Sequence, residues 1–380
     1  MRKTYLLKVV ICFILLCFIK SATGNINEVY DKNYEYVASR SQNEISENIV
    51  KQWSKPYRNW HYYPDYVIPA SPNITGFENV KMTDVPTVFK LPNDAKWYMS
   101  FIGYDGQGYQ SFIAESDNLC HWENIKLAMG YGPEGAFDYG GAVLGAYLYE
   151  NYNIKGLRVL KKKDGKYYSL YGAYPRQGGY ELRPGYQGLA MSNDGLFWQR
   201  AKNEPILSIY QDDIKEWEKD CIYQPWLIEH EDKFYNIYNA ASENIEQLGI
   251  ATSTDLFKWH RYNNNPVISV GDEGTYNEEF SSDAKVFWDK DHWVAFFFGV
   301  GKGGAHIMMA FSRDLLHWTI DPEPIYKAGG NPSGIDNKYA HKISLVWNSE
   351  NETFYMFYCA VNDDNKRGIG LINSKPINNK

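Results

Sequence analysis

A short motif recurs four times along the chain, with a serine followed six residues later by a tryptophan. The four copies read SDNLCHW, SNDGLFW, STDLFKW and SRDLLHW, and they begin at Ser116, Ser192, Ser253 and Ser312. Successive serines are 76, 61 and 59 residues apart, and a further 62 residues lead to Ser374, which has no matching tryptophan. A repeat of about sixty residues indicates one supersecondary unit that is stacked several times.

Each repeat contains runs of β-branched and aromatic residues that are divided by turn residues. In the first repeat these runs are Val85–Leu91, Trp97–Ile102, Ser111–Ala114 and His121–Ile125. Four antiparallel strands per unit, repeated about an axis, form a β-propeller. We therefore predict an all-β fold, a five-bladed β-propeller of four-stranded antiparallel blades. The last blade lacks its final strand, and we expect an N-terminal strand within Trp60–Thr75 to close the ring.

The repeated motif itself has a structural interpretation. The serine and the following aspartate are expected to cap a tight turn through side-chain-to-backbone hydrogen bonds, and the tryptophan is expected to pack between blades. The motif therefore predicts architecture rather than chemistry.

The N-terminus has the pattern of a secretory signal peptide. Arg2 and Lys3 precede an apolar stretch, Leu6–Ile19, and small residues follow it. We expect residues 1–23 to be a signal peptide, 24–80 a leader with the closing strand, and 81–380 the propeller. The protein is then secreted or periplasmic, and lipid modification of Cys17, which would anchor it to an outer membrane, stays open. The rest of the sequence contains no predicted membrane span.

Composition narrows the classes of partner. Removing the signal peptide takes away four basic residues and no acidic ones, so the net charge changes from −7 to −11. An acidic body argues against nucleic acid and anionic membranes as partners. The three remaining cysteines, at 120, 221 and 359, are too few and too dispersed for a disulfide framework or a zinc site. Aromatic residues make up 16% of the chain, which suits stacking on sugar rings as well as blade packing.

One polar position recurs just before the apolar part of each expected innermost strand. These strands read TDVPTVF, LRVLKK, YQPWLI, SDAKVF and AHKISLV, and the position is filled by Asp84, Arg158, Gln224, Asp283 and His341. Because the innermost strands of a propeller line its axis, we expect these five side chains to converge at one face. Two carboxylates and an imidazole at one pocket are suited to general acid–base catalysis. The alternative is that they only satisfy one another along the central tunnel.

Two further segments are expected to form walls of the pocket. The insertion in the second repeat contains Asp138, which either contacts a ligand or competes with Asp84 for the role of base. The segment from Tyr174 to Arg183 is rich in aromatic and charged residues, and its Tyr174 and Glu181 are predicted sugar contacts together with Arg158, Gln224 and Glu279. Glu279 is also an alternative acid.

On these residues the chain resembles the five-bladed propeller glycoside hydrolases of families 43, 32, 62, 68, 117 and 130. The segments SSDAKVFWDKDHWVAFFFG and AHKISLVWNSENETFYMFYCAV look most like family 117 and its neighbours. The resemblance implies Asp84 as the base, Asp283 as a supporting carboxylate and His341 as the acid. The acid glutamate of family 43 corresponds here to Gln224, and the nucleophile signature of family 32 is absent around Asp84.

The sequence thus predicts a secreted, exo-acting, inverting glycosidase that removes a terminal sugar from plant or algal oligosaccharides, in carbohydrate metabolism and polysaccharide degradation. Asp84, Asp283 and His341 are the predicted catalytic residues. No cofactor is required in this scheme, although a divalent cation on the axis, bound by His341 or the aspartates through water, stays open. The alternative functions are a carbohydrate-binding propeller without turnover and a glycoside phosphorylase resembling family 130.

Overall fold

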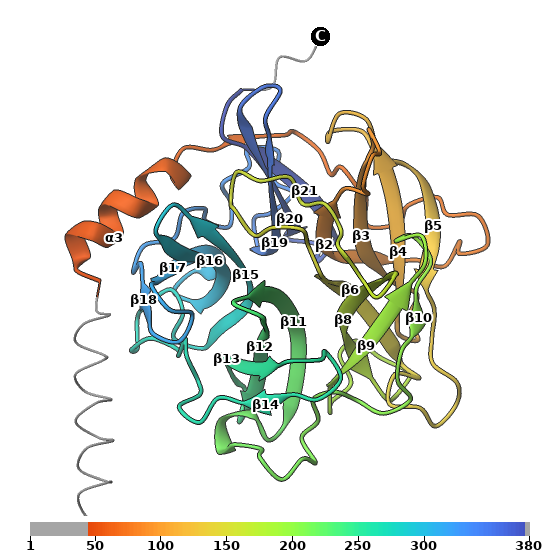
Figure 1. Cartoon of the computed structure of the whole chain (residues 1–380). Coiled ribbons are helices and arrows are strands. Elements are labelled where there is room, and N and C mark those ends of the chain that lie inside the picture. The colour runs from red at the N-terminus through yellow and green to blue at the C-terminus, as the bar shows by residue number, and fades with distance from the viewer. Residues whose placement is uncertain (1–44, 377–380) are drawn as a thin grey trace, which may run out of the picture. The chain divides into compact units, whose positions relative to one another are not determined.

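The computed structural model describes residues 45–376, whose regular secondary structure is almost entirely β (Figure 1). The helical segments are α3 (Glu47–Ser54), η1 (Lys55–Tyr57) and η2 (Glu216–Glu218). Within residues 45–376, no helix is long and apolar enough to cross a membrane. The predicted signal peptide, with Cys17, lies outside the described residues.

The strands of the described residues form five antiparallel meanders that follow one another in sequence. The first two contain β2 (Met82–Phe89), β3 (Trp97–Tyr104), β4 (Tyr109–Ser116) and β5 (Glu123–Met129), then β6 (Gly141–Tyr147), β8 (Lys166–Tyr174), β9 (Tyr186–Ser192) and β10 (Gln199–Arg200), with the short β7 (Lys162–Lys163) beside β8.

The next two meanders have the same strand order. They contain β11 (Cys221–His230), β12 (Lys233–Ser242), β13 (Ile245–Ser253) and β14 (His260–Arg261), then β15 (Phe280–Asp289), β16 (His292–Gly301), β17 (Gly304–Ser312) and β18 (Trp318–Ile320). The last meander contains β19 (Tyr339–Asn348), β20 (Thr353–Val361), β21 (Arg367–Asn373) and, from the other end of the described range, β1 (His61–Tyr62).

Figure 1 shows the meanders side by side around a common centre, with the first strand of each nearest to it. Direct hydrogen bonds join neighbouring inner strands: Val88 N donates to Ser344 Oγ (2.9 Å) between β2 and β19, and Trp226 Nε1 donates to Val286 O (3.0 Å) between β11 and β15. Buried apolar side chains fill the space between meanders, as where the Trp226 ring meets that of Phe287. The starts of the inner strands are thereby fixed near one another.

The last meander pairs with an N-terminal segment in the predicted range. His61 and Tyr62 face Asn373 and Ile372 in antiparallel register, and farther along Ile68 bridges Ile369. Because β21 would otherwise be an edge, β1 provides partners for its backbone groups.

One strand prediction was wrong. The inner strand of the second meander is β6, Gly141–Tyr147, and not the segment around Arg158. The glycine and alanine residues of β6 fit a crowded position at the centre, and they made the segment resemble a continuation of the preceding glycine-rich loop. Arg158 lies instead in the connection between β6 and β7.

The predicted capping role of the repeated motif is confirmed. In the third copy, Ser253 Oγ accepts hydrogen bonds from the N–H groups of Asp255 (3.1 Å) and Leu256 (3.0 Å). Trp259 Nε1 donates to the carbonyl of Leu256 (2.8 Å), and Leu256 has a left-handed backbone with φ of 71°. The corresponding residues of the other copies, Leu119, Gly195 and Leu315, also have positive φ. The motif therefore encodes a specific turn that directs a tryptophan into the core.

Replacing Ser253 by alanine should reduce the free energy of unfolding by about 1–2 kcal/mol, because two backbone N–H groups lose their acceptor. Chemical denaturation of Ser253→Ala measures this loss. Thr254→Ala, at the exposed neighbouring position, is the matched control and should change stability little. Equal stability of Ser253→Ala and wild type would show that the turn does not depend on this cap.

Candidate active site

Each of the five inner strands has an irregular register, which lies near the beginning of the strand in all of them except β6. The strand register shifts between Asp84 and Thr87, Leu144 and Ala146, Ile222 and Pro225, Ser282 and Lys285, and His341 and Ser344. Three non-glycine residues in these bulges have positive φ, namely Val85 (51°), Asp283 (48°) and Lys342 (51°). Bulges redirect side chains and are common beside active sites. Residues with a strained backbone persist only where the surrounding structure holds them in place.

The bulges correct the predicted equivalence of the inner-strand residues. Asp84, Ser282 and His341 occupy the same register position, immediately before the shift. Asp283 is one residue later, where the other strands have Val85 and Lys342. The sequence alignment was therefore wrong by one position for Asp283, because a bulge cannot be read from the alternation of side chains alone.

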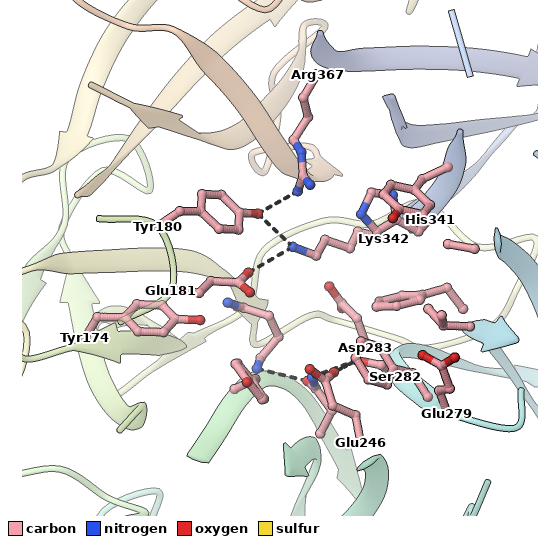
Figure 2. A pocket seen from close by; sticks show the side chains of 18 residues that line it. Tyr174, Tyr180, Glu181, Glu246, Glu279, Ser282, Asp283, His341, Lys342 and Arg367 are labelled. Carbon is pink, nitrogen blue, oxygen red and sulfur yellow. Dashed lines mark hydrogen bonds and ion pairs between the residues drawn. The ribbon is translucent and has the colours of Figure 1, made fainter. Parts of the chain in front are cut away.

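A cavity of about 280 Å³ opens at this end of the inner strands. Polar side chains from several meanders point into it (Figure 2). Its polar and aromatic lining residues include Tyr174, Tyr180, Glu181, Tyr223, Gln224, Asn239, Glu246, Glu279, Ser282, Asp283, Tyr339, His341, Lys342 and Arg367. The cavity thus combines carboxylates, cations and aromatic rings, the groups that bind and cleave sugars.

Asp84 lies beneath the cavity wall and is fully buried. Its Oδ2 atom accepts hydrogen bonds from Arg367 Nη1 (2.6 Å), Lys342 Nζ (3.0 Å) and Tyr180 Oη (3.0 Å), and Oδ1 accepts one from Val85 N (2.8 Å). Burial alone would raise the pKa of Asp84, but the Lys342 and Arg367 charges hold it well below its usual range. Asp84 is therefore a permanent carboxylate that positions two cations.

Lys342 connects this buried carboxylate to Glu181. Its Nζ atom lies 3.3 Å from Glu181 Oε1 (Figure 2). Burial works to lower the pKa of Lys342, yet Asp84 and Glu181 together raise it, so the ammonium group stays charged. Glu181 itself has a left-handed backbone (φ 48°), and its N–H donates to Tyr109 Oη (2.7 Å). The network thus fixes a strained, partly exposed glutamate at the cavity.

Glu246, at the start of β13, is the buried carboxyl on another side of the cavity. Its Oε2 atom accepts hydrogen bonds from Ser282 Oγ (2.8 Å) and Asn239 Nδ2 (3.3 Å). Burial and the nearby Glu181 charge raise the pKa of Glu246 to about 7. A carboxyl with this pKa can donate a proton at neutral pH and take it back afterwards.

Asp283 lines the cavity but has a buried ion pair of its own. Its Oδ1 atom lies 2.6 Å from Lys285 Nζ, while Oδ2 has no protein partner among the described residues. Lys285 also faces the ring of Trp226. Asp283 therefore presents one unengaged oxygen at the site.

His341 cannot be a protonated acid near neutral pH. Burial, reinforced by the Arg367 charge, lowers the pKa of His341 to about 3. Its Nδ1 atom lies 3.1 Å from the Cys359 carbonyl, and its ring contacts Phe298 and Tyr339. The predicted role as proton donor therefore conflicts with its surroundings, because the fold buries the ring and places the charge of Arg367, from a different strand, beside it.

Donor atoms of Asp84, His341 and Cys359 lie within 4.8 Å of one another. This arrangement does not suit a divalent cation, since Asp84 Oδ2 already faces the positive charges of Lys342 and Arg367. Burial also raises the pKa of the Cys359 thiol well above its usual value, which disfavours a thiolate ligand. In the described part of the chain, the axis is thus occupied by ammonium and guanidinium groups.

The other predicted contacts divide into two sets. Tyr174, Glu181, Gln224 and Glu279 line the cavity. Asp138 and Arg158 do not. Asp138 is buried, and its Oδ2 atom accepts from Arg200 Nε (2.6 Å) and Tyr171 Oη (2.9 Å).

Sequence reasoning missed Glu246, Lys342 and Arg367. Lys342 directly follows His341 and could have been found by allowing for a bulge. Glu246 and Arg367 lie near hairpin turns, and their positions become apparent only when the hairpins are folded over the cavity.

Comparisons with known proteins show the family and the fold of the chain. Residues 152–350 match a family model described as glycoside hydrolase 130, beta-1,4-mannooligosaccharide phosphorylase. A solved structure of a BT0996 RGII complex is similar with a TM-score of 0.74 and 27% identity, over 89% of this chain and 97% of that one. Another solved structure, described as a glycoside hydrolase, has a TM-score of 0.74 and 26% identity over the same shares. No curated protein matches the sequence.

More distant similarity extends across related families. Zg3597, a family 117 glycoside hydrolase from the marine bacterium Zobellia galactanivorans, has a TM-score of 0.57 and 14% identity, over 83% of this chain and 90% of that one. At this identity the likeness concerns the fold alone.

The raised pKa of Glu246 predicts a specific dependence of stability on pH. The pKa of this carboxyl is 4.5 in the unfolded state and about 7 in the folded state. Between pH 4.5 and pH 7 the folded state therefore retains a proton that the unfolded state has lost, and the free energy of unfolding falls as pH rises. In Glu246→Gln, the free energy of unfolding should no longer show this decline, which amounts to at most about 1.4 kcal/mol per pH unit. Denaturation of wild type and variant at pH 5, 6 and 7 measures the difference, with exposed Glu273→Gln as the control. Parallel pH profiles for wild type and Glu246→Gln would contradict the assignment.

Proposed function

The protein belongs to glycoside hydrolase family 130, within the five-bladed β-propeller glycoside hydrolases, and from the groups at its cavity we propose that it hydrolyses the terminal glycosidic bond of an oligosaccharide. In this proposal the five meanders are the five blades of a propeller, and β1 closes the ring. The single observation that most supports the reaction is the pair formed by Glu246 and Glu181 at one cavity, where burial and the charge of its neighbour raise the pKa of Glu246 to about 7.

Glu246 is assigned as the general acid that protonates the departing glycosidic oxygen. Glu181 is assigned as the carboxylate that deprotonates the attacking water, giving inversion at the anomeric carbon. The raised pKa of Glu246 suits the acid of this reaction, which must release a proton near neutral pH. Lys342 keeps Glu181 in place through its ion pair.

Asp84, Asp283 and His341 are retained in the proposal with altered roles. Asp84 positions Lys342 and Arg367, and neutral His341 packs beside them. Asp283 is assigned to accept a hydrogen bond from a sugar hydroxyl group, since one of its oxygens has no partner among the described residues. Tyr174, Gln224 and Glu279 are assigned as further sugar contacts from the cavity wall. Asp138 and Arg158 are removed from the set because neither lines the cavity.

The dimensions of the cavity support exo action. About 280 Å³ lies near the lower end of the ~300–1,000 Å³ range of small-ligand sites, which suits one terminal sugar better than the interior of a polysaccharide. Plant or algal oligosaccharides are the proposed substrates, and RGII is the first to test, since a similar solved structure is that of a complex with RGII. A secreted or periplasmic location is part of the same proposal.

Phosphorolysis is the second candidate, and the description of the matched family favours it. A phosphorylase must bind an inorganic phosphate beside the sugar. Two cations line the cavity, but Lys342 is paired with Asp84 and Glu181, and Arg367 is paired with Asp84. Since these carboxylates balance both positive charges, the site offers little net attraction for a dianion, and hydrolysis is preferred.

Kinetics on two leaving groups test the acid assignment. Glu246→Gln should reduce kcat/KM about 10²–10⁴-fold on a natural oligosaccharide, but much less on an aryl glycoside whose leaving group needs no proton. Glu181→Gln should reduce both activities, because water activation is lost in either case. Glu273→Gln is the exposed control. An equal loss on both substrates in Glu246→Gln would remove it from the acid role.

Product analysis with and without phosphate distinguishes the two reactions. We expect the rate to be independent of added phosphate, and NMR to show free reducing sugar of inverted anomeric configuration. A sugar 1-phosphate, or a rate that requires phosphate, would establish phosphorolysis instead.

A further inference from the structure

Arg158 lies at the opposite ends of the inner strands from the cavity. Its carbonyl accepts a hydrogen bond from Lys90 N (2.8 Å), just after β2, and nearby Asn153 bridges Trp288 near the end of β15. Asp283, which lines the cavity, is five residues before Trp288, so the two places are roughly 16 Å apart along the strand at ~3.3 Å per residue. Arg158 therefore belongs to a different region from the proposed active site.

The guanidinium group of Arg158 is buried, with 2% of the residue exposed. Its Nη1 atom donates to the carbonyls of Asn153 (2.7 Å) and Gly156 (3.2 Å), and its Cζ atom lies 4.4 Å from the centre of the Phe287 ring. The Nε and Nη2 atoms have no hydrogen-bond partner among the described residues. Buried donors of this kind are rare and require an explanation.

Arg158 also lacks a compensating carboxylate. Burial lowers the pKa of Arg158 to about 10, so the group still carries its full charge at neutral pH. No ion pair within residues 45–376 includes Arg158. Glu229, at the end of β11, does not compensate its charge, because Glu229 is paired with Lys161 (2.5 Å). A buried charge without a partner is strongly destabilising, and the aromatic ring of Phe287 offsets only part of that cost.

The two unpaired donors are on one edge of the guanidinium plane. The N–H bonds of Nε and Nη2 are parallel and form the fork with which arginine binds anions. The phenol groups of Tyr147 and Tyr149 are buried and also lack partners within the described residues. The Tyr149 ring packs against Trp226, and Trp226 packs against Phe287, the ring that Arg158 covers. The Arg158 fork and the Tyr149 hydroxyl group therefore belong to the same buried cluster.

We propose that Arg158 and Tyr149 bind a small monovalent anion, chloride in the first instance, in the interior of the protein. The anion accepts from Nε and Nη2 of Arg158 and from the Tyr149 hydroxyl group. A water molecule would satisfy the donors but leave the charge uncompensated, whereas a halide does both. Because Arg158 is 2% exposed, a small ion suits the site, and the bound halide would stabilise the connection between β6 and β7.

Bromide in place of chloride tests the site in the wild-type protein. Crystals grown with sodium bromide should show an anomalous peak at hydrogen-bond distance from Nε and Nη2 of Arg158, at a wavelength near the bromine absorption edge. A peak elsewhere only, or an ordered water with no anomalous signal beside Arg158, would overturn the proposal.

Thermal unfolding at constant ionic strength provides the second test. Replacing sodium gluconate by sodium chloride should raise the Tm of the wild type by about 2 °C or more, with saturation at high chloride. Arg158→Met should lose this dependence. Lys161→Met, which removes a nearby paired cation from the same connection, is the matched control and should retain it. Equal Tm values of the wild type in the two salts would contradict a stabilising halide, whether or not Arg158→Met folds.

Discussion

The buried carboxylate of Asp84 is the interaction on which the site depends. It joins β2 to Lys342 on β19, to Arg367 on β21 and to Tyr180 in the connection that follows β8. These residues are separated from Asp84 by 96 to 283 positions in the sequence. A permanent negative charge at this place attracts two cations, and one of them in turn fixes Glu181 at the cavity. The protonation pattern proposed for catalysis therefore begins with a group that does not itself contact the substrate.

Two features of the fold make this network possible: the inner strands converge at their starts, and bulges interrupt their regular pairing. Inner strands that begin near a common centre bring their first residues together, and the bulges of β15 and β19 redirect side chains toward the cavity. Lys342 and Asp283 both point toward the cavity from left-handed backbone conformations. Such conformations have a free-energy cost, and the ion pairs formed by each side chain offset part of it.

The general location of the site could be predicted from the sequence, but its chemistry could not. The periodic Ser–Trp motif defined the repeats, and the repeats placed Asp84, Asp283 and His341 at one end of the inner strands. Their roles depend on their surroundings: Lys342 and Arg367 lower the pKa of Asp84, and burial together with Arg367 lowers that of His341. Glu246 was not recognised because it lies on β13, the third strand of its meander, whereas the prediction considered the innermost strands. No sequence motif marks it, since its raised pKa results from burial in the folded structure. Arg158 was misplaced because the inner strand before it consists largely of small residues.

The central claim is that the environment of Glu246 keeps a proton on it at neutral pH. Titration of the side-chain carboxyl carbons by ¹³C NMR, with Glu246→Gln to assign the resonance, measures this pKa directly. We predict a value of about 7 in the wild type and a lower value in Glu181→Gln, where the neighbouring charge is absent. A value near 4.5 that is unaffected by Glu181→Gln would contradict the proposed acid and with it the mechanism.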